Sequence, residues 1–427
     1  MISVLIALQT ASAQSYETLY GKVTALDTGQ SIQAASIQLE GSSISNVTNS
    51  EGAFSLKVPK GSQGRVVVTH LGYRNAYVPL QEFRGPDPGK PVQIGLLPSF
   101  FTLDPATVHA EDAARIVHDA IWSVGRNYPR THTGMTAFYR ELIKKGNVKY
   151  IVLNEAVLDI DKAPYATMAK DKAAIFKGRG NLNYDVTDTL AVKFQGGVTA
   201  ALAVDIAKNP FPGVYPEVVD KYYNFTLEGI DNIDERSFYV ISFNQKPGGP
   251  DILYSGKLYI DTRTLAFGRA EVRLNTKGRE EEASKEFIIK KPQGFRFFVE
   301  DSHYTVSYRL CEDGLWYPDY THLFLSFSSK KKGTLFKGRF TVESEMVVTS
   351  RHETVPTIEK SETIRFNDIL SSKVSDFKDD NFWGEYNVIE PDQSINQIVK
   401  KIVRQLEHSG RKENEHPRPI QNLDSIR

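Results

Sequence analysis

The sequence is poor in features that would point directly to a function class. Its 427 residues contain one cysteine, Cys311, which excludes a disulfide within the chain and a lipid-modified cysteine near the N-terminus. Lysine plus arginine total 52 and aspartate plus glutamate total 52, so no net charge attracts nucleic acid or acidic lipid. No apolar run is long enough to cross a bilayer. We therefore expect no nucleic-acid partner and no transmembrane span.

The common catalytic motifs are also missing. None of the nine histidines is followed by glutamate three positions later, as one class of zinc peptidase requires. There is no Gly-x-Ser-x-Gly elbow, phosphate-binding loop or Rossmann fingerprint. His109 precedes Asp112 at a predicted helix start, where the dipole explains the acid, and His352 lacks the second histidine of a metalloprotease helix. We expect no catalytic residue, no metal site and no cofactor.

Two further groups have simpler explanations than catalysis. Cys311 is followed by Glu312 and Asp313, whose negative charges raise the pKa of a thiol and make it a poor nucleophile. The acidic run 280–282 is flanked by lysine and arginine, which favours a solvated turn over a paired acid and base.

Residues 1–13 have the pattern of a signal peptide. The short apolar run 2–8 ends in Ala11-Ser12-Ala13, which suits cleavage before Gln14. Only Met1 precedes the run, so the usual positive segment is missing and we expect the true start upstream. The alternative is a buried N-terminal strand. Export predicts a location in the periplasm or at the periphery of the outer membrane.

Residues 17–98 read as a small β-sandwich, because short β-type runs alternate with glycine, asparagine and serine. Gly29 lies in a turn and is free to take positive φ, and Phe54 and Leu56 should alternate into the core. The runs are LYGKVTA, ASIQLE, AFSLKV, RVVVTHLGY and PVQIGLL.

This stretch resembles the carboxypeptidase regulatory-like domain, a prealbumin-type β-sandwich. The resemblance covers about a fifth of the chain and implies a non-catalytic module. Such modules accompany peptidases, transporters and surface proteins, so it assigns no activity and no peptidase residue. It rests on residues 21–24, 27–30, 34–37, 49–56 and 71–73.

The sequence pattern of residues 110–390 predicts a larger α+β domain. Apolar residues in 111–127 recur at helical spacing, and 150–348 holds long alternating runs joined by short turns, which favours an antiparallel meander that curls. The order of helix, Phe-Tyr-Arg-Glu strand and meander resembles exported Bacteroidetes-type proteins of unassigned function. The phrase 255–266 resembles the half-barrel of the lipoprotein-carrier superfamily, which implies a hydrophobic cleft that a helix at 197–208 fills.

The C-terminal region predicts an amphipathic helix at 391–407 and a disordered tail at 408–427. Asp392 or Ser394 can cap this helix. Lys400, Lys401 and Arg404 edge it, so it either lies on a membrane or partner or packs on its own domain, and we favour packing.

One aromatic segment is the candidate binding site. Phe211, Tyr215, Tyr222 and Tyr223 are close in the chain and are suited to the rim of an apolar or carbohydrate-binding cleft. Packing in the core or a loop is the alternative.

These observations predict a mainly β protein with an N-terminal sandwich and a larger, curved, half-barrel-like meander carrying a few helices. The expected function is binding or scaffolding in the cell envelope, with a lipid, another apolar ligand or an outer-membrane protein as partner. The alternatives are a hydrolase or peptidase whose site has no motif, and an accessory of an outer-membrane transporter.

Overall fold

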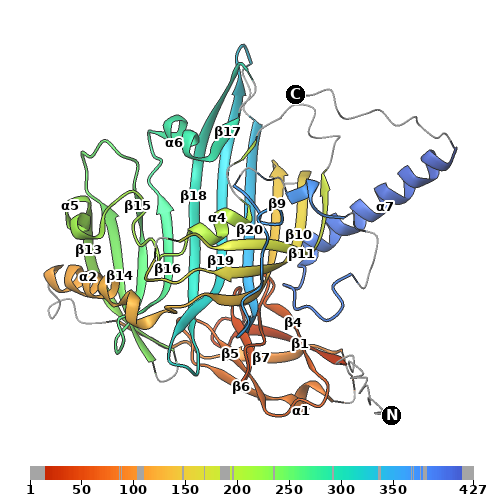
Figure 1. Cartoon of the computed structure of the whole chain (residues 1–427), viewed down its shortest axis with the longest axis horizontal. Coiled ribbons are helices and arrows are strands. Elements are labelled where there is room, and N and C mark those ends of the chain that lie inside the picture. The colour runs from red at the N-terminus through yellow and green to blue at the C-terminus, as the bar shows by residue number, and fades with distance from the viewer. Residues whose placement is uncertain are drawn as a thin grey trace, which may run out of the picture.

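The computed structural model describes residues 15–415 except 86, 88, 103–109, 147–148, 168, 183–192, 195–196, 234–235, 291–292, 335–337, 367, 369, 376 and 378–381. The predicted signal peptide and His109 therefore lie outside the described residues. The protein is mainly β, as the sequence predicts, with small sheets at the N-terminus and one large antiparallel sheet that does not close into a barrel (Figure 1).

The N-terminal sandwich packs a sheet of order β4-β1-β7 against a sheet of order β3-β2-β5-β6. Gly29 and Gly52 have φ of 70° and 74°, and a Cβ on Gly52 would lie 2.3 Å from the carbonyl oxygen of Val23, so that turn requires glycine. Phe54 and Leu56 are buried in the core, as predicted. The strands are β1 Tyr16–Ala25, β2 Ser36–Leu39, β3 Ser45–Val47, β4 Ala53–Pro59, β5 Arg65–Thr69, β6 Ala76–Pro79 and β7 Val92–Leu96, with a short helix α1 at Leu80–Phe83.

The large sheet has eleven strands in the order β11-β10-β9-β20-β19-β18-β16-β15-β14-β13-β8. Most neighbours in space are neighbours in sequence, which is the predicted meander, and β20, the last strand in sequence, pairs with β9 in the middle of the sheet order. The strands are β8 Phe100–Thr102, β9 Thr133–Lys145, β10 Lys149–Lys162, β11 Lys172–Leu182, β13 Tyr223–Ile233, β14 Arg236–Gln245, β15 Tyr254–Asp261, β16 Phe267–Leu274, β18 Phe295–Leu310, β19 Trp316–Lys331 and β20 Gly338–His352. A two-stranded pair, β12 Lys193–Phe194 and β17 Ile288–Lys290, lies outside it.

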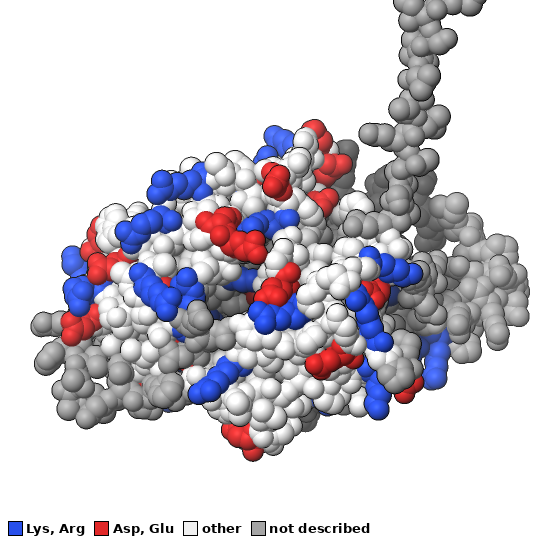
Figure 2. Space-filling view, turned by 90° about the horizontal axis from the view of Figure 1, so that it is seen from below, with Lys and Arg blue, Asp and Glu red and all other residues white. Residues whose placement is uncertain are grey.

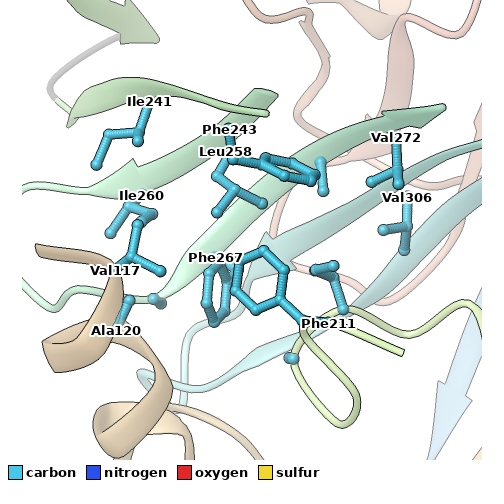
Figure 3. Close-up of a cluster of buried hydrophobic side chains, with 14 of the residues drawn as sticks. Val117, Ala120, Phe211, Ile241, Phe243, Leu258, Ile260, Phe267, Val272 and Val306 are labelled. Atoms are coloured by element: carbon cyan, nitrogen blue, oxygen red, sulfur yellow. The ribbon is translucent and has the colours of Figure 1, made fainter. Parts of the chain in front are cut away.

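One face of this sheet, here called the helix face, is covered by helices and loops. Helix α2 (Ala110–Asn127) buries Val117 and Ala120 against β15 and β16, and Phe211 of the loop after α4 (Val198–Ala203) reaches the same core beside Phe267 (Figure 3). The predicted helix at 197–208 is shorter than expected, because residues 204–215 form turns and bends. The chain's own side chains thus cover the helix face over β15 and β16.

The opposite face, here called the sandwich face, holds the N-terminal domain. Side chains alternate along a strand, so Phe138 points to this face while Tyr139 points to the helix face. Val47 of β3 packs in the same cluster as Phe138 and Trp383. The hydroxyl of Ser45 donates to the carbonyl of Val348 at 2.9 Å.

Residues 382–392, here called the strap, run along the same junction. The side-chain amide of Asn46 donates to the carbonyl of Val388 at 2.7 Å, and that of Asn49 donates to the carbonyl of Glu390 at 3.0 Å. The backbone N–H of Lys57 donates to Asn387 Oδ1 at 2.7 Å. The sandwich is therefore held against the sheet by β3 on one side and by the strap on the other.

The remaining helices correct two expectations. Residues 280–282 do not form a loop: they are the first turn of α6 (Glu280–Phe287), where acids complement the helix dipole, and Glu282 pairs with Arg279. Helix α7 (Gln393–Glu415) begins after the capping residue Asp392, whose Oδ1 accepts from the N–H of Ile395. The segment 408–415, expected to be disordered, belongs to α7, and 416–427 lie outside the described residues.

Charges of both signs are interspersed on the face seen in Figure 2, without a large area of one sign among the coloured residues. Within the part of the chain that the structure describes, no helix is long and apolar enough to cross a membrane.

Candidate functional site

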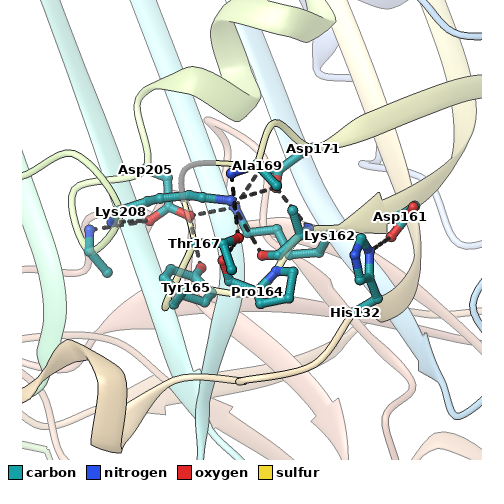
Figure 4. Close-up of polar contacts among 12 residues, drawn as sticks. His132, Asp161, Lys162, Pro164, Tyr165, Thr167, Ala169, Asp171, Asp205 and Lys208 are labelled. Atoms are coloured by element: carbon teal, nitrogen blue, oxygen red, sulfur yellow. Dashed lines mark hydrogen bonds and ion pairs between the residues drawn. The ribbon is translucent and has the colours of Figure 1, made fainter.

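A buried ionic network on the helix face centres on Lys162 at the end of β10 (Figure 4). Its Nζ lies 2.7 Å from Asp171 Oδ2 and 2.5 Å from Asp205 Oδ2. Lys208 Nζ lies 3.3 Å from Asp171 Oδ1, so two cations face two carboxylates. Asp205 also accepts from the hydroxyls of Tyr165, at 2.8 Å, and Tyr308.

The electrostatics of this network keep it charged. Burial alone would raise the pKa of the Asp205 carboxyl, but Lys162 and the two tyrosine hydroxyls outweigh burial and lower it. Burial alone would lower the pKa of Lys162, but Asp205 and Asp171 raise it. A cavity of about 20 Å³ beside Asp205 has room for roughly one water. With every charge paired, the network fixes the segment after α4 to β10 and offers no free reactive group.

The structure divides the four aromatic residues singled out from the sequence. Phe211 and Tyr223 are only 2% and 1% exposed, and their tilted rings lie with centroids 4.9 Å apart inside the core. Tyr215 and Tyr222 are 79% and 37% exposed. The four residues therefore do not line one cavity in this conformation, although they belong to one segment.

A cleft of about 530 Å³ opens on the other side of the sheet, between it and the sandwich. The sandwich contributes the outward residues of β2 and β5, such as Thr69, and the aromatic ring of Tyr77. The sheet contributes Arg269 of β16, Arg309 of β18 and Trp316 of β19. This volume is typical of small-molecule sites, which often lie between domains.

The cleft combines aromatic surface with hydrogen-bond donors that have no partner. Arg269 uses Nε to bind Glu271 at 3.0 Å, and its two terminal nitrogens make no hydrogen bond within the described chain. Trp316 is 3% exposed, and its Nε1–H, which has no partner among the described residues, is buried below the surface of the cleft. The guanidinium carbon of Arg65 lies 4.3 Å from the centroid of the Tyr77 ring. A ligand here would meet donors and rings together.

His70 of the cleft has a pKa lowered from 6.5 to about 4, first by burial and then by the positive charge of Arg269. Its Nδ1 lies 2.7 Å from the carbonyl oxygen of Leu71, which can only accept, so Nδ1 carries the proton and Nε2 is an acceptor. The ring is therefore neutral near pH 7.

Acidification is expected to destabilise the protein through His70. Below pH 6.5 the unfolded chain binds a proton at His70 that the folded protein binds only near pH 4. The free energy of unfolding therefore decreases as the pH is lowered from about 6.5 to about 4. Between pH 7 and pH 5 this group should cost about 2 kcal/mol. Urea unfolding of the wild type and of His70→Asn at both pH values measures it, and the variant should lose less stability. Equal losses in the two proteins would contradict the assignment.

Cys311 and His352, the described residues that the sequence offered as catalytic candidates, do not lie in a catalytic arrangement. The pKa of the Cys311 thiol is raised as predicted, but burial is the main cause, and Arg351 and Arg309 oppose it. His352 Nε2 contacts the hydroxyls of Thr136, at 2.8 Å, and Ser350, at 3.2 Å, on the sheet surface. Among the described residues, no group of three or more His, Cys, Asp or Glu side chains is arranged to hold a metal ion.

The fold and turn geometry of the sandwich agree with the resemblance found in the sequence. Residues 19–86 match the CarboxypepD_reg-like domain. The match lies within the sandwich alone and therefore assigns no family to the rest of the chain. No curated protein matches the chain.

Three solved structures resemble the chain only distantly. An outer membrane lipoprotein-sorting protein domain from Vibrio parahaemolyticus is 11% identical, with a TM-score of 0.28 over 61% of this chain and 97% of that one. A DUF1329 family protein from Desulfovibrio piger and a LolA superfamily protein from Nitrosomonas europaea are each 12% identical over 55% of this chain and 93% of theirs, with TM-scores of 0.21 and 0.19. TM-scores this low support no inference about ligand or activity.

No local sequence pattern marks the cleft beside the CarboxypepD_reg-like domain. His70 and Tyr77 come from that domain, whereas Arg269, Arg309 and Trp316 come from strands some 200 residues further along the chain. Each residue alone looks like an ordinary strand residue. Only the docking of the two domains brings them together.

Proposed function

We propose that this chain is an exported cell-envelope protein that binds a ligand, without turnover, in the cleft between the sandwich and the sheet. The observation that carries the proposal is the 530 Å³ cleft between two walls that are fixed to each other. The hydroxyl of Ser45 and the side-chain amide of Asn46 bond across the junction to the sheet and the strap. A site with fixed walls loses little entropy on binding.

The helix face supports this proposal less well. Helix α2 and the loop after α4 bury their apolar residues against the sheet there, in one continuous core with Phe211, Leu258 and Phe267. An apolar ligand at that face would have to displace these side chains. The cleft requires no displacement.

The hydrolase alternative has no activated nucleophile in the described cleft. Ser36, Thr69 and Ser307 line it, but among the described residues no hydroxyl donates to Nε2 of His70, the nitrogen that could act as a base. We accordingly propose binding as the function, with the periplasm or the outer-membrane periphery as the place and an outer-membrane protein as a further partner.

Native mass spectrometry of the protein purified from its own envelope tests the cleft. Thr69→Trp places a large side chain in the cleft and narrows it without disturbing the sandwich core, because Thr69 points outward while Val66 and Val68 point inward. Lys22→Trp, on the outer face of the other sheet of the sandwich, is the matched control. We expect a stoichiometric adduct on the wild type and the control and its loss from Thr69→Trp.

Two outcomes would contradict the proposal. A clean mass for the wild type would favour a scaffold role. An adduct that survives Thr69→Trp but is lost from Tyr215→Ala with Tyr222→Ala would place the ligand at the aromatic segment predicted from the sequence.

A further inference from the structure

We infer that the ligand of the cleft is an amphipathic oxyanion, with its acidic head at Arg269 and Arg309 and its apolar body against Tyr77, Leu71 and Trp316. This inference rests on the proposed function. It names the ligand's chemistry, which cleft volume alone does not.

The two arginines are placed to share one head group. Arg269 of β16 is directly opposite Ser307 of β18, and Arg309 lies two residues further along that strand. Residues diagonal across a strand pair lie about 7–8 Å apart, a distance that two long guanidinium side chains can close on one anion. Arg309 Nη2 contacts Ser45 Oγ at 2.9 Å and Asp319, so its Nε and Nη1 are left for a ligand.

The two acidic residues that line the cleft, Glu40 and Asp319, already form ion pairs with arginines of the chain. Both carboxylate oxygens of Glu40 are bound by Arg65, at 2.8 and 2.7 Å. Asp319 binds Arg309, and Arg236 binds Asp261 at 2.7 Å. The terminal nitrogens of Arg269 and the Nε and Nη1 of Arg309 therefore make no hydrogen bond within the described chain. Four guanidinium nitrogens on one wall of the cleft, two of Arg269 and two of Arg309, favour a ligand rich in acceptors.

Burial is the main cause of two pKa shifts in the cleft. The pKa of His70 is lowered first by burial and then by the charge of Arg269. The pKa of Arg309 is lowered to about 10 by burial and, to a smaller extent, by Arg351, while Cys311 opposes the shift. A bound anion would stabilise both arginines.

The apolar walls complete the site. Tyr77 is 43% exposed, and its ring lies on the sandwich side of the cleft, while Trp316 and Phe238 stack edge to face at 6.0 Å on the sheet side. Leu71 and Leu310 are also part of the lining. A flat or chain-like apolar body fits between these surfaces, and its head group then reaches the arginines.

Fluorescence titration of the full chain with two dyes tests the inference. Anilinonaphthalene sulfonate carries a negative head, and phenylnaphthylamine has the same body without it. We expect the anionic dye to bind about ten-fold more tightly, since hydrogen bonds to charged groups contribute that much or more. Arg269→Gln should remove the difference and Arg269→Lys should restore part of it. Arg273→Gln, a paired arginine on the same strand outside the cleft, should leave it intact.

The possible results separate the inference from the proposed function. If both dyes bind equally and Thr69→Trp abolishes both, the cleft binds apolar ligands and the oxyanion inference is wrong while the function stands. If Thr69→Trp affects neither dye, neither binds in the cleft, and both proposals fail. Competition of the bound dye by dodecanoate and by dodecyl phosphate then distinguishes a carboxylate from a phosphate head group.

Discussion

Replacing Asp205 with asparagine is expected to lower the free energy of unfolding by about 3–5 kcal/mol. The side chain of Lys162 is 3% exposed, and Asp205 and Asp171 are its two anionic partners. With Lys208 the network holds two positive and two negative charges, so the substitution leaves one uncompensated positive charge in the interior. Urea unfolding of the wild type and the variant measures the difference.

Two further variants show whether charge is the cause. Glu228→Gln breaks the partly exposed pair with Lys257 and should cost less than about 1 kcal/mol. Lys162→Met combined with Asp205→Asn removes one charge of each sign and should recover most of the loss, because the pair of Asp171 and Lys208 remains. A double variant no more stable than Asp205→Asn would mean that hydrogen-bond geometry, not charge balance, sets the cost.

The sequence predicts the architecture of this protein better than its site. Helix α2 and the long strands repeat their apolar residues at regular spacing, and the turn residues Gly29 and Gly52 mark the sandwich, so local patterns suffice for them. The length of α4 was predicted wrongly because its apolar residues continue past Ala203 into turns that the Lys162 network fixes. That network depends on contacts between residues over forty positions apart in the chain.

The prediction of a solvated loop at residues 280–282 was wrong for a related reason. Composition alone predicts a solvated turn there, and the structure makes it the first turn of α6, where Glu281 pairs with Arg296 of β18. Similarly, Phe211 and Tyr223 carry the same sequence signal as Tyr215 and Tyr222, although packing buries the first two and exposes the others. Aromatic content predicts contact, but the fold decides whether the contact is with a ligand or with the core.

Glu155→Gln is the second substitution with a large expected effect, about 3–5 kcal/mol. Glu155 is 1% exposed and lies between two guanidinium groups, with Nε of Arg140 and Nε of Arg179 each 2.8 Å from one of its oxygens. Arg140 also donates to the carbonyl of Ile389 at 2.8 Å, and the guanidinium of Arg179 lies 5.1 Å from the Trp383 ring. A neutral side chain at 155 would leave two buried cations and weaken the strap as well.

Because Glu155→Gln lacks this carboxylate, its free energy of unfolding should depend on pH differently from that of the wild type. Burial would raise the pKa of Glu155, but Arg140 and Arg179 outweigh burial and lower it below the usual 4.5. Its stabilisation is therefore complete above that value and is lost as pH falls through the folded-state pKa, so Glu155→Gln should lose less stability in acid than the wild type. Glu300→Gln, which breaks an exposed pair with Arg339, should keep the wild-type profile. Hydrogen exchange should also rise at the strap in Glu155→Gln. Unchanged exchange there would show that the strap does not depend on Glu155 and that its hydrogen bonds to Asn46, Asn49 and Lys57 are sufficient to hold it.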